Sequence, residues 1–304
     1  MDSLYPFQGH YLDLNGQQYH YLDEGQGEVL LMVHGNPTWS IYYREVVKAL
    51  RADYRCIVPD HIGCGRSSKP DDAAYDYTLR QRVDDLEALL DHLGIRDNIT
   101  LIVHDWGGMI GMGFAARYPE RIKRLVIFNT AAFHLPPEKP LPWMLGLVRN
   151  TPLGAWAVSR LNAFAVGAAW VGCTQNRMSA AVREAYVAPY NTPANRIATL
   201  RFVQDIPLTP DDRAYALVSE SQATLAAGTF ADTPALICWG MKDFVFDHHF
   251  LTRWRAFLPD AEVHEFPRAG HYVLEDASAE IIPLVQAFLT ANPIHNASHN
   301  QTDN

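Results

Sequence analysis

The chain has 304 residues, which is enough for one large domain or for a domain with a substantial insertion. Its content of 48% hydrophobic and 19% charged residues is that of an ordinary globular protein with a sizeable core. The formal net charge of −9 disfavours nucleic acid and anionic membrane surfaces as partners.

The N-terminal stretch "MDSLYPFQGHYLDL" lacks the basic region followed by an apolar run that marks a signal peptide. No window of the chain approaches the ~20 apolar residues that a membrane helix needs. The four cysteines form no Cys-x-x-Cys pair, and we expect them to be buried, reduced thiols. Together these features predict a cytoplasmic protein without a membrane span.

Short apolar runs alternate with helical patterns through most of the chain. The runs are continuous rather than alternating, which is typical of strands covered on both faces. Strands are expected over 29–34, 54–60, 99–104, 124–129, 235–240 and 261–266, and helices over 40–51, 78–94 and 280–289. Gly94 ends the second helical pattern. Strand–helix alternation of this kind predicts an α/β fold with a mostly parallel sheet.

The alternation stops between residues 133 and 225, where only helices and loops are expected. A helical block that interrupts a sheet is best interpreted as a cap inserted over the site. The prediction is therefore a core in two parts, 1–132 and 226–293, a helical cap at 133–225 and a polar, frayed tail at 294–304.

The stretch "LIVHDWGGMIG" (101–111) is an apolar strand that enters a glycine turn before a helix. Many hydrolases place a nucleophilic serine at this turn, but here the position holds Asp105. An aspartate is ionised at neutral pH and attacks carbon without an activating base. We expect Asp105 to be the nucleophile; the alternative is an aspartate that caps the next helix.

Two further residues fit the chain order nucleophile–acid–base. His271 lies in the loop after the last expected strand, the usual place of the general base in folds of this kind. Asp243 follows the strand "ALICWG" and is the favoured acid to orient His271, with Asp247 as its competitor. Asn129 ends the preceding strand and cannot be the ionised acid.

Asn36 and Trp106 flank the expected nucleophile in the motifs "HGNPTW" and "HDWGG". An amide NH₂ and an indole N–H are uncharged donors, so in a dry pocket they would hold a departing anion. The alternatives are a turn residue before Pro37 for Asn36 and core packing for Trp106.

The remaining polar motifs are interpreted as structural. His34 and His104 sit at buried strand ends and are expected to be scaffolding. The glycine loop "PDHIGCGRSSKP" (59–70) lacks a phosphate-binding ending, so its Asp60 and His61 are expected to fix loops near the site. The neighbouring residues His248 and His249 are expected to begin a surface helix and to point to different faces, rather than to bind a metal.

The motifs "HGNPTWS", "PDHIGCG" and "HDWGGMIG" together resemble the α/β-hydrolase superfamily, specifically its haloalkane dehalogenase-like branch. The resemblance covers nearly the whole chain. It implies the α/β-hydrolase fold: a mostly parallel eight-stranded sheet, flanking helices and an inserted helical cap. It also implies an Asp nucleophile, an Asn–Trp donor pair and an acid–His pair, at Asp105, Asn36, Trp106, Asp243 and His271, with no cofactor and no metal.

Motifs in and around the cap, such as "NTAAFHLPPEKPLPW", "NRIATLRFVQDIPL" and "HYVLED", resemble the β-lactone decarboxylases of bacterial long-chain olefin biosynthesis. The resemblance implies a carboxy-lyase that converts a cis-3,4-dialkyl-oxetan-2-one to a cis-alkene and CO₂. It implies a hydrophobic substrate with long alkyl chains, and as partner the β-lactone synthetase of the same pathway. The alternatives are a haloalkane dehalogenase and a catalytically dead binding protein.

The cap also carries large apolar side chains that suit alkyl chains. We expect them to line an apolar pocket, although each of them could instead only pack the cap. They are Phe133, Trp143, Trp156, Phe164 and Trp170.

Overall fold

The computed structural model describes residues 3–294. Within them, one eight-stranded sheet has the order β1-β2-β4-β3-β5-β6-β7-β8. The strands β3 to β8 run parallel, while β1 and β2 form an antiparallel hairpin at one edge. The strands are Gly9–Leu14, Gln17–Glu24, Val29–Val33, Arg55–Pro59, Ile99–Asp105, Ile122–Thr130, Ala235–Gly240 and Glu262–Phe266. The mostly parallel, eight-stranded α/β-hydrolase sheet is confirmed.

The six strands predicted from continuous apolar runs are the six parallel ones. The hairpin β1–β2 escaped that search because its first strand is an edge strand, with exposed residues alternating with half-buried ones. An antiparallel strand with one face toward solvent alternates in this way and carries no continuous apolar run. The predicted tail beyond Ile294 lies outside the described residues.

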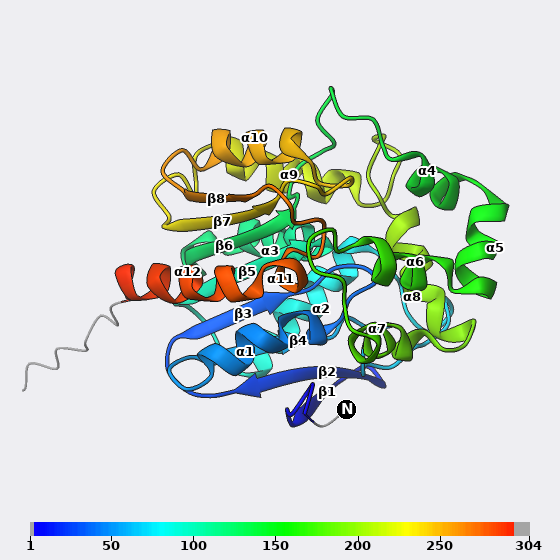
Figure 1. The fold of residues 1–304 in the computed structure, drawn as a ribbon, viewed down its shortest axis with the longest axis horizontal. Helices are drawn as coiled ribbons and strands as arrows, with labels where there is room; N and C mark the ends of the chain where they lie inside the picture. The colour runs from blue at the N-terminus through cyan, green and yellow to red at the C-terminus, as the bar shows by residue number, and fades with distance from the viewer. Residues whose placement is uncertain (1–2, 295–304) are drawn as a thin grey trace, which may run out of the picture.

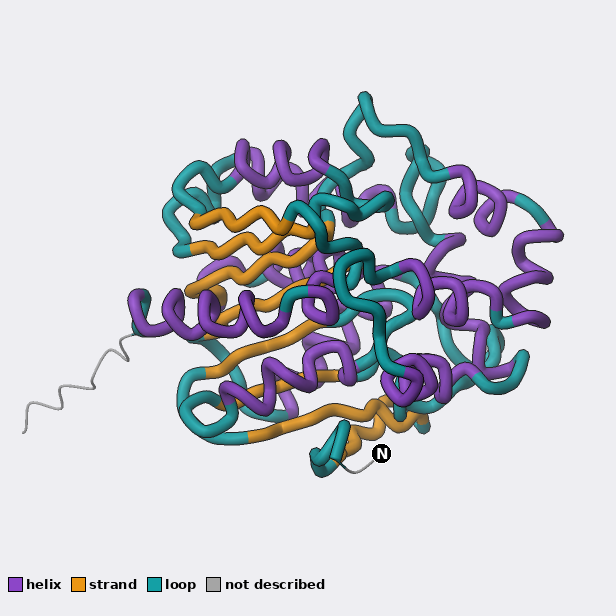
Figure 2. The backbone as a smooth tube through the Cα atoms, viewed as in Figure 1, coloured by secondary structure: helices purple, strands orange, loops and turns teal. Residues whose placement is uncertain are grey.

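Helices cover both faces of the sheet, as Figures 1 and 2 show. Successive residues of the central strands point to opposite faces, so Leu30 and Met32 of β3 join one core while Leu31 and Val33 join the other. The flanking helices are α1 (Arg44–Leu50), α2 (Leu79–His92), α3 (Trp106–Arg117), α9 (Tyr215–Ala226), α10 (His248–Phe257), α11 (Val273–Asp276) and α12 (Ser278–Ala291), with 3₁₀ turns at Ser40–Tyr43 and Pro119–Arg121.

Between β6 and β7 the described chain forms helices and loops, most of which lie beyond the carboxyl ends of the parallel strands (Figure 1). The helix α9 is different, because it packs against α3 and so belongs to the helical layer of the sheet. The other elements are α4 (Trp143–Asn150), α5 (Pro152–Leu161), α6 (Ala163–Val171), α7 (Ala180–Val187) and α8 (Ile197–Gln204), with 3₁₀ turns at Ala188–Tyr190 and Ala194–Arg196. We call α4 to α8 the cap; the limits at residues 133 and 225 stay a prediction.

In residues 3–294 no helix has both the length and the apolar content to cross a membrane.

The turn from β5 into α3 is the most constrained point of the backbone. Asp105 has a φ of 52° and a ψ of −127°, a conformation that non-glycine residues rarely adopt. A side chain at Gly107 would collide with the backbone carbonyl of Val33, and one at Gly108 would collide with Thr130. The glycines therefore let the turn press against β3 and β6 while Asp105 stands at its apex.

We predict that Gly107→Ala lowers the free energy of unfolding by about 1–3 kcal/mol, because the new methyl group meets backbone that cannot move aside. The matched control is Gly167→Ala in α6, where a Cβ meets nothing within 4 Å. That change should raise the free energy of unfolding by about 0.5–1 kcal/mol through helix propensity. Urea denaturation measures both; equal effects of the two substitutions would contradict this account of the turn.

Candidate active site

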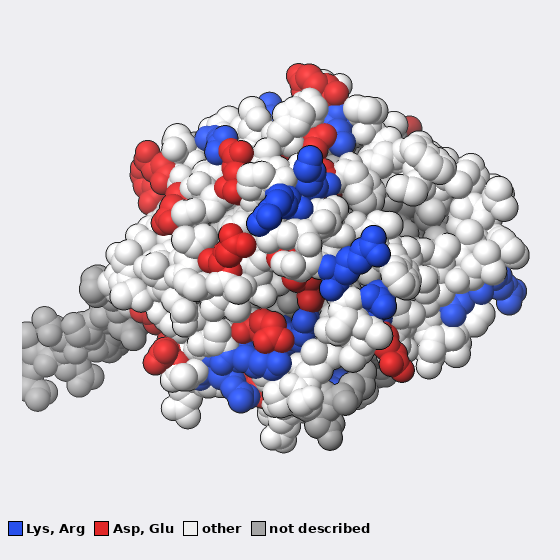
Figure 3. Space-filling view, viewed as in Figure 1, with Lys and Arg blue, Asp and Glu red and all other residues white. Residues whose placement is uncertain are grey.

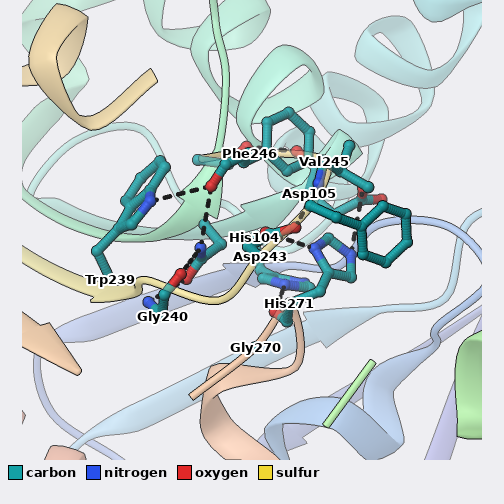
Figure 4. A network of polar contacts seen from close by, with 12 residues as sticks. His104, Asp105, Trp239, Gly240, Asp243, Val245, Phe246, Gly270 and His271 are labelled. Carbon is teal, nitrogen blue, oxygen red and sulfur yellow. Dashed lines mark hydrogen bonds and ion pairs between the residues drawn. The ribbon is translucent and has the colours of Figure 1, made fainter. Parts of the chain in front are cut away.

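Three polar side chains meet at the carboxyl edge of the sheet (Figure 4). Asp105 ends β5, Asp243 lies in the loop after β7, and His271 lies in the loop after β8. The Nδ1 atom of His271 is 2.8 Å from Oδ2 of Asp243, and its Nε2 is 3.7 Å from Oδ2 of Asp105. All three side chains are buried. The structure thus brings the predicted nucleophile, acid and base together in one line.

The positive charge of His271 and the negative charges of Asp105 and Asp243 stabilise one another. Burial by itself lowers the pKa of His271, but the charge of Asp243, its hydrogen bond and the charge of Asp105 raise it above the ordinary value. Burial raises the pKa of Asp105; His271 and the backbone N–H groups of Asn36 and Trp106 act against that rise without cancelling it. An imidazolium between two carboxylates therefore keeps a buried Asp105 closer to its charged form.

Backbone donors fix the direction of the Asp105 carboxylate. The N–H of Asn36 donates to Oδ1 at 2.5 Å, and the backbone N–H of Trp106 also donates to this carboxylate. The hydroxyl of Thr130 donates to the backbone carbonyl of Asp105 from the next strand. One oxygen of the carboxylate is thus held by the backbone, while Oδ2 faces His271.

The predicted donor pair lies beside the carboxylate. Asn36 uses its NH₂ to donate to the carbonyl of Thr199 in the cap at 3.1 Å, which leaves its second N–H. The ring of Trp106 packs on Phe202 with the ring centroids 5.3 Å apart. Within residues 3–294 its indole N–H donates no hydrogen bond, and Trp106 and Asn36 both line the cavity described below. Each residue therefore retains a neutral donor for a ligand.

The competition between Asp243 and Asp247 is resolved by their contacts. Asp243 accepts from Nδ1–H of His271 and from the N–H of Val245 at 2.8 Å. Asp247 instead caps α10 by accepting from the N–H of His249 at 3.0 Å, and it pairs with Lys139 at 2.7 Å. Asp243, and not Asp247, is therefore the carboxylate that contacts the imidazole.

Asn129 has a positioning role that the sequence analysis did not assign. Its NH₂ donates to the carbonyls of Gly240 and Phe246, and its oxygen accepts from the N–H of Gly240 (Figure 4). Because Gly240 and Phe246 bracket the loop that carries Asp243, Asn129 fixes that loop at both ends. The sequence signal for this role was an amide side chain at the end of a buried strand, but that signal does not identify the groups that the amide contacts.

The buried histidines around the site contact backbone groups. His104 places its Nε2 atom 2.9 Å from the carbonyl of His271, and Nδ1 of His34 lies 2.7 Å from the carbonyl of Gly35. His34 also accepts from the N–H of His61 at 3.2 Å. Asp60 accepts from the N–H of Ser40 at 2.6 Å and from that of Arg66 at 2.8 Å. These contacts tie the loops under the site together, the role that the sequence analysis expected.

His248 and His249 begin α10 as expected, but the prediction that they point to different faces is wrong. Their ring centroids are 4.0 Å apart, and with Asp247 they form a group whose possible ligand atoms lie within 4.8 Å of one another. The ammonium group of Lys139 already pairs with Asp247 at 2.7 Å. That positive charge makes the group a poor cation site.

An apolar cavity of about 460 Å³ lies between the sheet and the cap. Among the described residues Asp105 is the only carboxylate residue that lines it, and Asn36, Trp106 and His271 are polar residues of the same lining. Of the predicted aromatic side chains, Phe133, Trp143 and Phe164 line the cavity. For Trp156 and Trp170 the prediction is wrong, because they point outward with 51% and 55% of their surface exposed.

Comparison with known proteins gives consistent results. The family described as "alpha/beta hydrolase fold" matches residues 28–278. The cis-3-alkyl-4-alkyloxetan-2-one decarboxylase of Shewanella oneidensis is 62% identical, over 95% of this chain and 91% of that protein. The enzyme of the same name from Xanthomonas campestris is 56% identical, over 90% and 93%. Haloalkane dehalogenase 2 of Mycobacterium bovis is 35% identical, over 92% and 94%.

The contacts of His271 predict its titration. In the intact protein its pKa should lie above the ordinary value of histidine, and in Asp243→Asn it should fall, because the main charge that opposes burial is lost. NMR titration of the imidazole measures both values. Asp247→Asn is the control of equal charge change; asparagine caps a helix as well as aspartate does, so this change should cost at most about 1 kcal/mol of stability, through the lost ion pair with Lys139, and leave the pKa of His271 in place. The reverse pattern would make Asp247 the orienting acid.

Proposed function

This chain belongs to the alpha/beta hydrolase fold family, and within it we propose a cis-3-alkyl-4-alkyloxetan-2-one decarboxylase that releases a cis-alkene and CO₂. The enzymes of that name are 62% and 56% identical to this chain across nearly its full length, against 35% for the dehalogenase relative. A substrate with two alkyl chains suits a cavity whose walls are almost wholly apolar.

The observation that carries the mechanism is the place of Asp105. It is the one carboxylate residue of the cavity lining, it is held by two backbone N–H groups, and neutral donors of Asn36 and Trp106 stand next to it. Such a site favours attack by an anion on carbon, with a second anion received by the neutral donors.

In the proposed first step, Oδ2 of Asp105 attacks the ring carbon that bears the lactone oxygen. The new bond is an alkyl–aspartate ester, the ring C–O bond breaks, and its electron pair leaves as a carboxylate. Asn36 and Trp106 hold that carboxylate through their remaining N–H groups. Displacement inverts the attacked carbon and places the ester anti to the carboxylate.

The second step is fragmentation. The electron pair of the bond between the carboxylate and its carbon forms the alkene, CO₂ leaves, and Asp105 departs as a carboxylate, so the enzyme is restored without added water. Because inversion is followed by anti fragmentation, the two alkyl chains of a cis-lactone remain on one side. No freely rotating cation is required. Attack of Asp105 on the carbonyl carbon, which gives an anhydride, is the alternative first step.

His271 has different duties in the two candidate reactions. In a dehalogenase it must deprotonate the water that hydrolyses the ester. In the proposed decarboxylase no water is consumed, and the role of His271 is electrostatic. Its positive charge stabilises the ionised form of Asp105, which is the nucleophile of the first step and the leaving group of the second. The raised pKa of His271 supports this electrostatic duty, since it increases the charged fraction near neutral pH.

The setting of the enzyme is part of the proposal. We place it in the cytoplasm, in long-chain olefin biosynthesis, with a β-lactone synthetase as its supplier and partner. Cys56, Cys64, Cys173 and Cys238 are all free and buried, which suits a reducing compartment.

The deciding assay offers purified protein a cis-dialkyl β-lactone and, separately, a 1-haloalkane. We expect cis-alkene and CO₂ from the lactone and little halide from the haloalkane. Asp105→Ala should lower the rate of alkene formation at least about 10⁴-fold, because the nucleophile is lost. Asp247→Asn, which removes a carboxylate from the loop beside the site, should keep most of the activity.

Two outcomes would contradict the proposal. Fast halide release with no alkene would make this protein a dehalogenase. Alkene formation in ¹⁸O-labelled water that places label in Asp105 after many turnovers would show hydrolysis of the ester instead of fragmentation.

The pH profile follows from the pKa of Asp105. The nucleophile is active only when ionised, so activity is present above its pKa and is lost as the pH falls through it. Burial raises that pKa, and the acid limb of kcat/KM should therefore lie at higher pH than that of an exposed aspartate. In His271→Gln the opposing positive charge is gone, so the limb should move to higher pH as the rate falls. A limb that stays in place in this variant would contradict the electrostatic role of His271.

A further inference from the structure

The cap helix α5 is apolar on both of its faces. Gly154, Ala157 and Val158 line the cavity on the inner side. On the outer side Leu153 is 65% exposed and Trp156 is 51% exposed, although neither contributes to the cavity. A surface helix normally turns charged and polar residues to water, and a helix that is apolar all round is normally covered.

The next helix repeats the pattern without a single polar side chain. In α6, "AFAVGAAWV", Gly167 and Ala168 line the cavity, while Val166 and Trp170 are 38% and 55% exposed. Nine of the eleven large hydrophobic side chains that are exposed in residues 3–294 lie on α4, α5 and α6. We call these nine the apolar cap face: Trp143, Met144, Leu147, Leu153, Trp156, Leu161, Val166, Trp170 and Val171.

The apolar cap face is continuous with the mouth of the cavity. Trp143 is 75% exposed and Val171 is 53% exposed, yet both also line the cavity. Phe244, 41% exposed in the loop that carries Asp243, does the same from the side of the sheet. A molecule that covered this face would therefore cover the entrance to the site.

The charge of the cap differs from that of the rest of the chain. The cap, residues 143–204, holds six arginines and one acidic residue, Glu184, which is a net charge of +5; the rest of the chain therefore has a net charge of −14. Arg160 is four residues after Trp156 in α5 and thus shares its exposed face. Arg183 stacks over Trp170 at 4.2 Å from the ring centre. In Figure 3 the side of the molecule formed by α4 to α6 is mostly white, with blue side chains at its edge.

These arginines have their charges available. In the cap Arg149 pairs with Asp212 and Arg201 pairs with Asp72, whereas among the described residues no ion pair involves Arg160, Arg177 or Arg183. Exposed tryptophan with unpaired arginine is the composition of surfaces that enter the boundary of a lipid layer. A second copy of this chain fits less well, because a symmetric contact would bring the arginines of both copies together without acids between them.

We propose that the apolar cap face docks on the surface of a lipid bilayer that contains anionic headgroups, with the cavity mouth against the acyl chains. The net charge of −9 disfavours such a partner for the molecule as a whole, but the charge that meets the bilayer is the positive charge of the cap. The purpose rests on the proposed function: a dialkyl lactone and its alkene are lipids, and docking lets them pass between bilayer and cavity without crossing water. The docking itself depends only on the surface.

The experiment is sedimentation of the full-length protein with vesicles, without substrate. We expect binding to vesicles of phosphatidylglycerol and phosphatidylcholine, weaker binding to phosphatidylcholine alone, and weaker binding as salt is raised. The double variant Trp156→Ser/Trp170→Ser should reduce binding at least tenfold. Arg160→Gln should reduce binding to the anionic vesicles about fivefold.

The controls alter equally exposed residues away from the cap. Tyr11→Ser removes a side chain that is 52% exposed on β1, and Lys123→Gln removes an exposed charge near the amino end of β6; both should leave binding unchanged. Thermal melting verifies that each variant is folded. Trp156 and Trp170 do not line the cavity, so decarboxylation of a short-chain, water-soluble lactone should be equal in the double variant and the parent.

The proposal is overturned if the protein does not bind anionic vesicles, or if the cap substitutions leave binding unchanged. It is also overturned if the double variant instead abolishes a dimer in sedimentation equilibrium, which would make a second copy the occupant. Failure of the parent protein on the short-chain lactone would refute the proposed function and leave the vesicle result as it stands.

Discussion

The structure depends on one buried negative charge. Asp105 stands in an apolar cavity, where an isolated carboxylate would take up a proton. Two backbone N–H groups and the imidazole of His271, itself held by Asp243, oppose that outcome. The site thus sets the desolvation of this carboxylate, which favours attack in the proposed reaction, against contacts that favour its ionised form.

The fold supplies this compensation from widely separated parts of the sequence. The carboxyl ends of β5, β7 and β8 bring Asp105, Asp243 and His271 to one edge, and the glycine turn after β5 presses Asp105 against β3, whose following loop offers the N–H of Asn36. Asn129 holds the acid loop at both ends. Over this rigid base the cap provides apolar walls and few polar groups. In the proposed reaction the edge of the sheet therefore supplies the reacting groups, and the cap selects the substrate.

The sequence predicted the sheet and the residues at its edge better than it predicted the cap. Continuous apolar runs mark strands buried on both faces, and the position of Asp105 and His271 after such runs places them at one edge. The choice of Asp243 over Asp247 rested on loop spacing, and the contact with Nδ1 of His271 agrees with it. Contacts that hold the loops were harder to predict, because Asn129 contacts a residue more than a hundred positions away.

In the cap, local pattern misled the prediction. Trp156 and Trp170 were expected in the pocket because large apolar side chains of the cap suit alkyl chains, but helices with apolar side chains on both faces give no periodicity from which to choose the inner side. The prediction for His248 and His249 failed for a different reason: Asp247 contacts both the backbone N–H and Nδ1 of His249, and the ring of His248 packs against the imidazole held there. In both cases the contacts of individual side chains, which no periodicity reveals, decide the orientation.

The account makes one central claim: the carboxylate of Asp105 becomes covalently attached to substrate. Mass spectrometry of a single turnover with a cis-dialkyl β-lactone, quenched in acid within milliseconds, tests it directly. We predict that the peptide containing Asp105 gains the full mass of the lactone and loses it as alkene appears. Alkene formation with Asp105 unmodified at every time, or with the added mass on another residue, would contradict the account.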